Sequence, residues 1–451
     1  MKKSTTNLTE GNIPRLIIMF ALPILLGQVF QNLYHSVDSM VVGNYVGTTA
    51  LAAVTSCSDI SMLLVGFFTG LSAGSGVLFA RYFGAKDHDS LHKAIHTALL
   101  FSFILGVIMA TLGIIFTPFL LTIVDCPVDV RPEAEVYLRI YLIGILFTAL
   151  YNVGSGVLRA VGNSRAPFIY LVISSVTNIV LDILLVVVFR MGVAGVGIAT
   201  IISQFVSVVL VTRNMMRTND VYKLVLKDLG IDIDILKEVI RLGLPAAIQS
   251  SLISISNLFV QRYVNGFGSD AMAGIGAAEK IDKFVGMIAQ SLGLSTATFV
   301  SQNYGAKKID RAYRGIRTVL LMNLVPLSVM GIIVFVNSGW AIRLFTDNPN
   351  AIYYGAKMLT TMTPFFICQA LNQTFSNAVR GFGKSTVVMV LSILGMVGCR
   401  QLFLAIAMHI QRNVVWVYIG FPLGWFCSAV FVMIYYFIFI KKKFGKTVPN
   451  D

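Results

Sequence analysis

The chain has few charged residues. Asp, Glu, Lys and Arg make up 12% of its 451 residues, whereas soluble globular proteins average about 25%. Hydrophobic residues make up 56%, and the mean hydropathy is +0.79. This composition excludes an ordinary soluble domain and indicates a protein that crosses a membrane many times.

Cysteine is also scarce, and the sequence lacks several common catalytic signatures. The five cysteines are scattered without a CxxC pair, so no disulfide scaffold is predicted. No phosphate-binding loop (GxxxxGK[ST]) and no HExxH metal motif is present. We therefore expect neither an enzyme nor a nucleotide-driven pump, and we expect no cofactor.

Apolar runs of about 20 residues recur through the whole chain, which is the length that a membrane-spanning helix needs. They predict an all-α polytopic protein with twelve transmembrane helices and both termini on one side. The first run is too long for the apolar region of a signal peptide, so it counts as a span. The expected spans are 15–42, 50–80, 94–117, 136–158, 166–189, 192–212, 239–263, 271–301, 316–337, 355–378, 386–409 and 414–440.

Most Lys and Arg residues fall on one side of these spans. The opposite loops and helix ends hold only Arg131, Arg139, Arg190, Arg262, Arg343, Lys357 and Arg412. By the positive-inside rule both termini are cytoplasmic, and the protein is expected in the plasma or inner membrane. This distribution explains the net charge of +14 without a nucleic-acid partner; the expected surroundings are the lipid bilayer.

The sequence repeats itself at an offset of 221 residues. "ALYNVGSGVLRAVGNS" (149–164) aligns with "ALNQTFSNAVRGFGKS" (370–385), and Gly84-Ala85-Lys86 aligns with Gly305-Ala306-Lys307. A constant offset over separated blocks indicates duplication. We expect an N-terminal lobe (1–212), a cytoplasmic linker (213–238), a C-terminal lobe (239–440) and a basic tail (441–451). Because each lobe has six helices, an even number, both lobes enter the membrane from the same side. An axis along the membrane normal is therefore expected to relate the two lobes, with a cleft between them.

Asp182 lies in the apolar run "TNIVLDILLVVVF" (177–189). A carboxylate at the bilayer centre costs about 2.5–3.5 kcal/mol on insertion scales, so it needs a cavity, a partner or an ion. Asn178 is four residues earlier and shares its helix face. At about 1.5 Å per residue, Asp182, Asp38 and Thr200 all fall roughly 7–12 Å from the outer ends of their spans.

The set Asp38, Asn178, Asp182 and Thr200 offers oxygen ligands, which suit hard cations or protons. Two close carboxylates also share one proton readily, because like charges disfavour double ionisation. The alternative is that Asn178 and Asp182 merely bond across helices. At the 221-residue offset their counterparts are Cys399 and Phe403, so the site is expected in the N-terminal lobe alone.

Three further features remain open in function. Glu279, Lys280 and Asp282 form a charged cluster with Lys283, either neutralised within itself or binding a cationic substrate. Pro23 interrupts the first span and is a hinge or a static bend. His88, His92 and His96 follow i,i+4 spacing without an evident carboxylate, so we expect no metal site beyond a sodium ion.

The sequence resembles the multidrug and toxic compound extrusion (MATE) transporters over nearly its whole length. The resemblance rests on Leu22-Pro23, Asp38 and Gly43, and on longer motifs. These are "VLFARYFGAKD" (77–87) with "TFVSQNYGAKK" (298–308), "GVLRAVGNSRAP" (156–167) with "NAVRGFGKS" (377–385), and "TNIVLDILLV" (177–186) with "GVAGVGIATIISQ" (192–204).

The resemblance implies two six-helix lobes around a V-shaped cleft, and drug export driven by inward sodium or proton flow. The sequence resembles the bacterial DNA-damage-inducible-like branch, which has a cation site in the N-terminal lobe. Its ligands correspond to Asp38, Asn178, Asp182 and Thr200, and its bend corresponds to Pro23. The acidic residues that another branch carries in helices 7 and 10 are absent here.

These observations predict a secondary antiporter that exports amphipathic, cationic compounds, with a proton or sodium as the coupling ion. We expect it to work as a monomer. Two alternatives remain: an exporter or flippase of lipid-linked or glycan cargo, whose cleft should be strongly cationic, and a polytopic receptor or scaffold that transports nothing. The sequence does not choose between sodium and protons.

Overall fold

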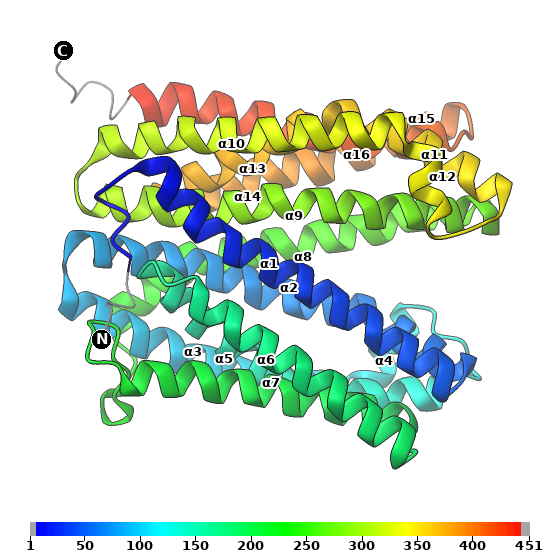
Figure 1. The fold of residues 1–451 in the computed structure, drawn as a ribbon, viewed down its shortest axis with the longest axis horizontal. Helices are drawn as coiled ribbons and strands as arrows, with labels where there is room; N and C mark the ends of the chain where they lie inside the picture. Colours follow the sequence, from blue (N-terminus) through cyan, green and yellow to red (C-terminus); the bar gives the residue numbers. More distant parts are fainter. Residues whose placement is uncertain (1–5, 443–451) are drawn as a thin grey trace. The chain divides into compact units, whose positions relative to one another are not determined.

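The computed structural model describes residues 6–442, and in this range every regular element is a helix (Figure 1). Residues 1–5 and 443–451 lie outside the described range, including most of the predicted basic tail. The described chain divides into two compact units. Unit 1 contains Thr6, Asn7 and residues 22–247; unit 2 contains Leu8–Ala21 and residues 248–442.

Two long helices are shared between the units. In α1 (Ile13–Tyr45), residues up to Ala21 belong to unit 2 and the rest to unit 1. In α8 (Ile233–Asn265), the order is reversed: residues up to Ala247 belong to unit 1 and the rest to unit 2. Each division falls within two residues of an internal proline, Pro23 in α1 and Pro245 in α8. The N-terminal part of α1 therefore belongs to unit 2, and the N-terminal part of α8 belongs to unit 1.

The remaining helices of unit 1 follow one another along the chain with short connections. They are α2 (Thr48–Ala85), α3 (His88–Ile115), α4 (Thr117–Ile123), α5 (Arg131–Ala160), α6 (Arg165–Asp182), the π-helical segment η1 (Ile183–Val188), α7 (Gly192–Arg217) and the 3-10 turn η2 (Leu226–Asp228). The connection between α7 and α8 therefore spans residues 218–232.

Unit 2 repeats this order of long helices. It contains α9 (Ser269–Gly305), α10 (Ile309–Val336), α11 (Ser338–Arg343), α12 (Pro349–Met362), η3 (Thr363–Phe365), α13 (Phe366–Gly381), α14 (Ser385–Ile393), η4 (Leu394–Cys399), α15 (Arg400–Ile410), α16 (Val415–Tyr435) and η5 (Tyr436–Lys441).

Eleven helical stretches in the described range are long and apolar enough to cross a membrane. The twelfth expected span, 355–378, is not one continuous helix, because the 3-10 turn η3 separates α12 from α13. Pro364 lies inside this turn and lacks the N–H that an α-helix requires there. The all-helical, two-repeat fold is as predicted, with this one interrupted span.

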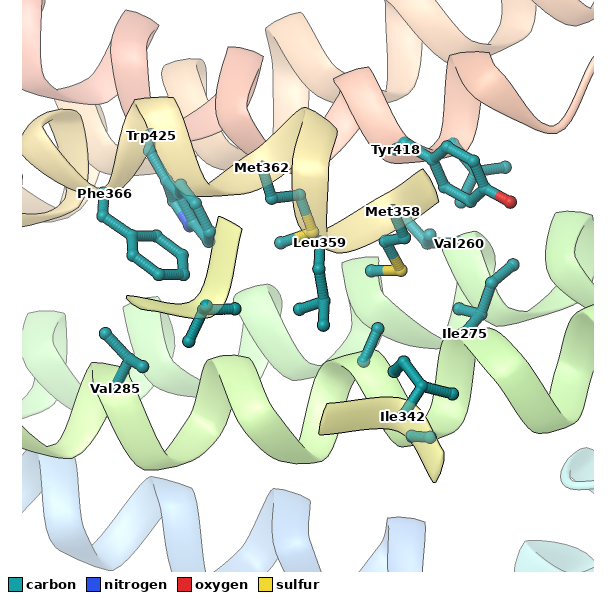
Figure 2. Packing of buried hydrophobic residues seen from close by; sticks show 14 of the residues in the cluster. Val260, Ile275, Val285, Ile342, Met358, Leu359, Met362, Phe366, Tyr418 and Trp425 are labelled. Carbon is teal, nitrogen blue, oxygen red and sulfur yellow. The ribbon is translucent and has the colours of Figure 1, made fainter. Parts of the chain in front are cut away.

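Each unit has its own apolar core. In unit 1, Val42, Ala53 and Cys57 pack with residues of α5 such as Leu138. In unit 2, Figure 2 shows Met358, Leu359 and Met362 of α12 among side chains from α8, α9 and α16, with Phe366 beside Trp425. The Phe366 and Trp425 rings are 6.3 Å apart.

Glycines let helices approach closely in unit 1. A Cβ on Gly74 of α2 would overlap the carbonyl oxygen of Leu242 in α8. Such small-residue contacts are typical of membrane helices, since association within lipid depends on close packing. The Arg81 side chain of α2 adds an ion pair with Glu238 at 2.7 Å, so the first part of α8 is held firmly within unit 1.

Candidate functional site

Helices α1 and α6 run side by side in unit 1 and bring two acidic residues together. Phe30 stacks edge-on against Phe168 with ring centroids 6.0 Å apart, and a Cβ on Gly27 would lie 3.6 Å from Leu171. Eleven residues further along each helix from the Gly27–Leu171 contact are Asp38 and Asp182. Their carboxyl groups lie within electrostatic range of each other.

The acidic pair is almost completely removed from the surface. Asp182 is 0% exposed, Asn178 1% and Asp38 9%. Within the described chain, neither Asp182 oxygen and neither polar atom of the Asn178 amide has a hydrogen-bond partner, and Asp38 Oδ1 also lacks one. Asn178 thus makes no side-chain hydrogen bond to a neighbouring helix within the described residues, whereas Asp182 of α6 interacts electrostatically with Asp38 of α1.

Thr200 lies on α7, which packs against both α6 and η1. Its hydroxyl donates to the Val196 carbonyl oxygen at 3.0 Å, which leaves the lone pairs of the hydroxyl oxygen available. Ser174 of α6 donates to the Ser203 carbonyl oxygen of α7 at 2.6 Å. This bond fixes α6 against α7 one turn below Asn178.

Aromatic side chains surround Asp38, and sequence reasoning missed them. Tyr34, one turn earlier on α1, and Tyr137 of α5 are within electrostatic range of its carboxyl group. Tyr137 stacks on Tyr141 with centroids 6.0 Å apart. The i,i+4 spacing of these two tyrosines in an apolar run was the available signal.

The backbone changes immediately after Asp182. Helix α6 ends at this residue, and the next six residues form the π-helical segment η1. A π-helix has i→i+5 hydrogen bonds, and short π-helical segments inside helices occur frequently at functional sites. Asp182 is thus at the junction between a regular helix and a segment that can readjust.

The site offers carboxylate, amide and hydroxyl oxygens without competing amines. Buried oxygens with no protein donor fit a hard cation, which oxygen ligands prefer, or a proton held by one carboxylate. The chemistry of the set therefore supports reversible cation binding. In unit 2 the corresponding positions are Cys399 and Phe403, and Phe403 packs edge-on against Trp416 at 6.0 Å.

The predicted charged cluster in unit 2 lies along α9 and extends to α15. Glu279 is within electrostatic range of Lys283 and of Arg400, and Asp282 is within range of Glu279 and Lys283. Lys280 is directed elsewhere, with its ammonium 5.5 Å from the Phe345 ring centroid. The described residues contain no direct Glu279–Lys283 ion pair.

Arg400 is the residue of this cluster that sequence reasoning left without a role. Its side chain is 3% exposed, donates to the Ser256 hydroxyl and lies over the Phe421 ring at 5.6 Å. Unit 2 thus holds a buried cation near the position where unit 1 holds buried acids.

Pro23, the predicted hinge, lies inside continuous α1 at the point where the helix passes from one unit to the other. This position fits a hinge, since a missing hydrogen bond there weakens the helix between two separately packed parts.

The structure adds a carboxylate to the histidines that the sequence singled out. Ligand atoms of His92, His96 and Asp228 lie within 4.8 Å of one another. Both His96 nitrogens, however, are used by the backbone: Nδ1 donates to the His92 carbonyl oxygen at 2.7 Å, and Nε2 accepts from the Val225 N–H at 3.1 Å. His96 thus joins the connection 218–232 to α3 through its hydrogen bond with Val225.

Comparisons with known proteins agree with the repeat. A family model described as MatE matches residues 23–184 and 245–406, once in each half. "Probable multidrug resistance protein YoeA" of Bacillus subtilis is 30% identical over 447 residues, covering 97% of this chain and 96% of the relative.

Solved structures show the same fold. A MOP superfamily transporter from Pyrococcus furiosus has a TM-score of 0.89 and 22% identity, covering 99% of both chains. An outward-facing MATE family transporter of the same superfamily has a TM-score of 0.89 and 21% identity, covering 99% of this chain and 100% of the other.

Proposed function

Because this chain belongs to the MatE family of membrane transporters, we propose that it is a multidrug antiporter, exporting amphipathic, cationic compounds in exchange for sodium ions or protons. As a transporter it is not an enzyme. Relatives described as multidrug resistance proteins support the drug-export part of the proposal. The observation that carries the coupling part is the buried Asp38–Asp182 pair, in which both Asp182 oxygens and Asp38 Oδ1 lack a hydrogen-bond partner.

The coupling ion binds at Asp38, Asn178, Asp182 and Thr200 in unit 1. Removing two carboxylates from water is costly unless a cation or a proton compensates their charge. Binding therefore draws α1 and α6 together, and release leaves like charges that push them apart. Since Asp38 is on α1, this change is transmitted along the helix toward Pro23, where α1 enters unit 2.

The free energy for export comes from the ion gradient. Each charge that moves inward across the membrane supplies about 2.3 kcal/mol per 100 mV. Exchange of one coupling ion for one monovalent cationic compound moves no net charge, so the concentration gradient of the ion drives that exchange, and the membrane potential adds to it only when more than one ion enters per compound. Both termini are cytoplasmic in this scheme, and a single chain is the working unit.

The acidic cluster of unit 2 is proposed as the substrate subsite. Glu279 and Asp282 attract the cationic group of a substrate, while Arg400 compensates Glu279 when no substrate is bound. The flippase alternative requires a strongly cationic site for pyrophosphate. The mixed charges of Glu279, Asp282, Lys283 and Arg400 favour the cationic drug instead.

Efflux of a fluorescent lipophilic cation tests this function. Cells expressing wild type, Asp38→Asn or Asp182→Asn are loaded with the dye, and sodium and proton gradients are imposed separately. We expect wild type to export the dye under one of the two gradients, and each variant to lose at least nine-tenths of that gradient-dependent rate. Equal membrane expression is verified for all chains.

The matched control is Asp125→Asn. Asp125 is an exposed acid of unit 1 with a positive φ of 51°, a conformation that Asn adopts well, so this variant changes the same charge without affecting the buried pair. It should export dye like wild type. Full efflux by both buried-site variants under every gradient would refute the coupling site, and absence of efflux by wild type would refute the drug-export function.

A further inference from the structure

Unit 2 contains a cavity that neither the coupling site nor the substrate subsite uses. It has a volume of about 470 Å³ and lies between the last turns of α8 and the helix α15. Its lining includes Phe259, Arg262, Phe267, Gln401, Met408 and Arg412. We call it the Arg262–Arg412 pocket. Its volume is within the usual range for small-ligand sites, roughly 300–1,000 Å³.

The charge in this pocket is all positive. No acidic residue lines it, and among the described residues neither Arg262 nor Arg412 forms an ion pair. In unit 1, by contrast, the positive charges of Arg131 and Arg139 are compensated, because both residues form ion pairs with Glu135. The two pocket arginines therefore retain positive charge that can attract an anion.

Arg412 is held in place. Its Nη2 donates to the Gly266 carbonyl oxygen at 2.6 Å, and its guanidinium lies 5.7 Å from the Phe267 ring centroid. A Cβ on Gly266 would lie 2.8 Å from this nitrogen, so any larger residue at this position would displace the guanidinium. A guanidinium fixed by one N–H keeps other donors for an anion, and arginine suits phosphate geometry particularly well.

Other parts of the lining are apolar and open. Phe259 is 55% exposed, and Met408 is half-buried beside it in the lining. A free inorganic anion would gain nothing from these groups. An amphiphile would place its headgroup on the arginines and its chain along Phe259 and Met408, where van der Waals packing holds the chain.

We propose that the Arg262–Arg412 pocket binds the phosphate headgroup of an anionic phospholipid. The proposed orientation places this end of unit 2 in the outer leaflet; the binding itself does not depend on the proposed transport function. The lipid would connect the end of α8 to α15. Because α8 passes from unit 1 to unit 2, bound lipid would stabilise the part of this helix that belongs to unit 2.

The test is lipid binding by the purified full chain in neutral detergent, measured by native mass spectrometry. Phosphatidylglycerol is the probe, and phosphatidylcholine and inorganic phosphate are the comparison ligands. We expect wild type to bind phosphatidylglycerol at least tenfold more tightly than phosphatidylcholine. Arg262→Gln should weaken this binding about tenfold, the loss expected for one charge-assisted contact, and Arg412→Lys should weaken it less.

Arg343→Gln is the matched control. Arg343 is an exposed arginine at the same end of unit 2, outside the pocket, and its replacement should change binding less than twofold. Equal weakening by Arg343→Gln and Arg262→Gln would refute the pocket and leave only general charge attraction. Equal binding of phosphatidylglycerol and inorganic phosphate would refute the lipid in favour of a free anion.

A second variant separates folding from binding. Gly266→Ala displaces Arg412 without removing its charge, and we expect at least fivefold weaker phosphatidylglycerol binding with unchanged melting temperature in the absence of lipid. Asp182→Asn should bind the lipid like wild type. Lipid binding by a chain that exports no drug would sustain this inference while the proposed function fails.

Discussion

Replacing Asp182 by Asn should stabilise the protein when the coupling ion is absent. The wild-type carboxyl group is 0% exposed, and both its oxygens lack a protein partner. A carboxylate at membrane depth costs about 2.5–3.5 kcal/mol on insertion scales. Asn keeps the shape but removes the charge, and its own unpaired amide recovers only part of this cost. We expect a net gain of about 1–2 kcal/mol.

The assay is thermal unfolding of the purified chain in detergent, with sodium concentration and pH varied. For a unit of this size, about 1 kcal/mol corresponds to roughly 2–4 °C, so Asp182→Asn should melt several degrees above wild type in choline buffer at pH 8.5. Adding the coupling ion at about 100 times its dissociation constant should stabilise wild type by about 2.7 kcal/mol. The variant should show no such gain.

A lower melting temperature for Asp182→Asn than for wild type without the ion would refute the predicted stabilisation, because Asp182 would then have a stabilising partner. An ion-dependent gain of equal size in both chains would also refute it. Asp125→Asn, the exposed control, should leave both the melting temperature and the ion response unchanged.

Three further predictions concern α2, the start of α8 and the connection 218–232. Gly74→Ala should lower the free energy of unfolding by about 1–3 kcal/mol, because the added methyl overlaps the Leu242 carbonyl. Gly76→Ala should leave it unchanged, because a Cβ there would have only one neighbour, at 3.9 Å. Chemical denaturation of both variants measures the difference. Hydrogen bonds from the Ile235 and Asp234 N–H groups lower the pKa of Asp232. The stabilisation that ionised Asp232 gives to the start of α8 is therefore complete above the usual aspartate pKa, about 3.9, and is lost as pH falls through the lower pKa of the folded state. The protection of this turn against hydrogen exchange should fall only in that pH range, and Asp232→Asn should remove this pH dependence. His96→Ala should make the connection 218–232 at least fivefold more sensitive to limited proteolysis, because its bond to Val225 is lost, whereas replacing the exposed His88 should not.

The long helices were predictable because membrane spans are defined by composition over about 20 residues. Pro364 shows the limit of this approach: the window from 355 to 378 was predicted as one span, although it contains polar residues such as Gln369 and Asn372, and the structure divides it at Pro364. The division of α1 and α8 between units was equally hidden. The polar linker suggested a boundary between the lobes, but the packing of Leu8–Ala21 depends on tertiary contacts with residues such as Leu292.

The buried acids were predictable for a different reason. Asp182 conflicts with its apolar surroundings, so the cost of burying it identifies it without any tertiary knowledge. Tyr137 carries no such conflict, because tyrosine is common in apolar helices, and only the fold brings it near Asp38. Asp228 was missed beside His92 because it is far away in sequence, although the two side chains lie 3.5 Å apart.

The central claim, that ion movement through the Asp38–Asp182 site is coupled to export, is tested most directly by ion flux in proteoliposomes. The purified chain is reconstituted with a cationic substrate on one side only, and movement of sodium and of protons is recorded as the substrate runs down its gradient. If transport is coupled antiport, wild type moves one of these ions in the opposite direction, and Asp182→Asn moves neither. Substrate transport by wild type without ion movement, or ion movement of equal rate in Asp182→Asn, would contradict it.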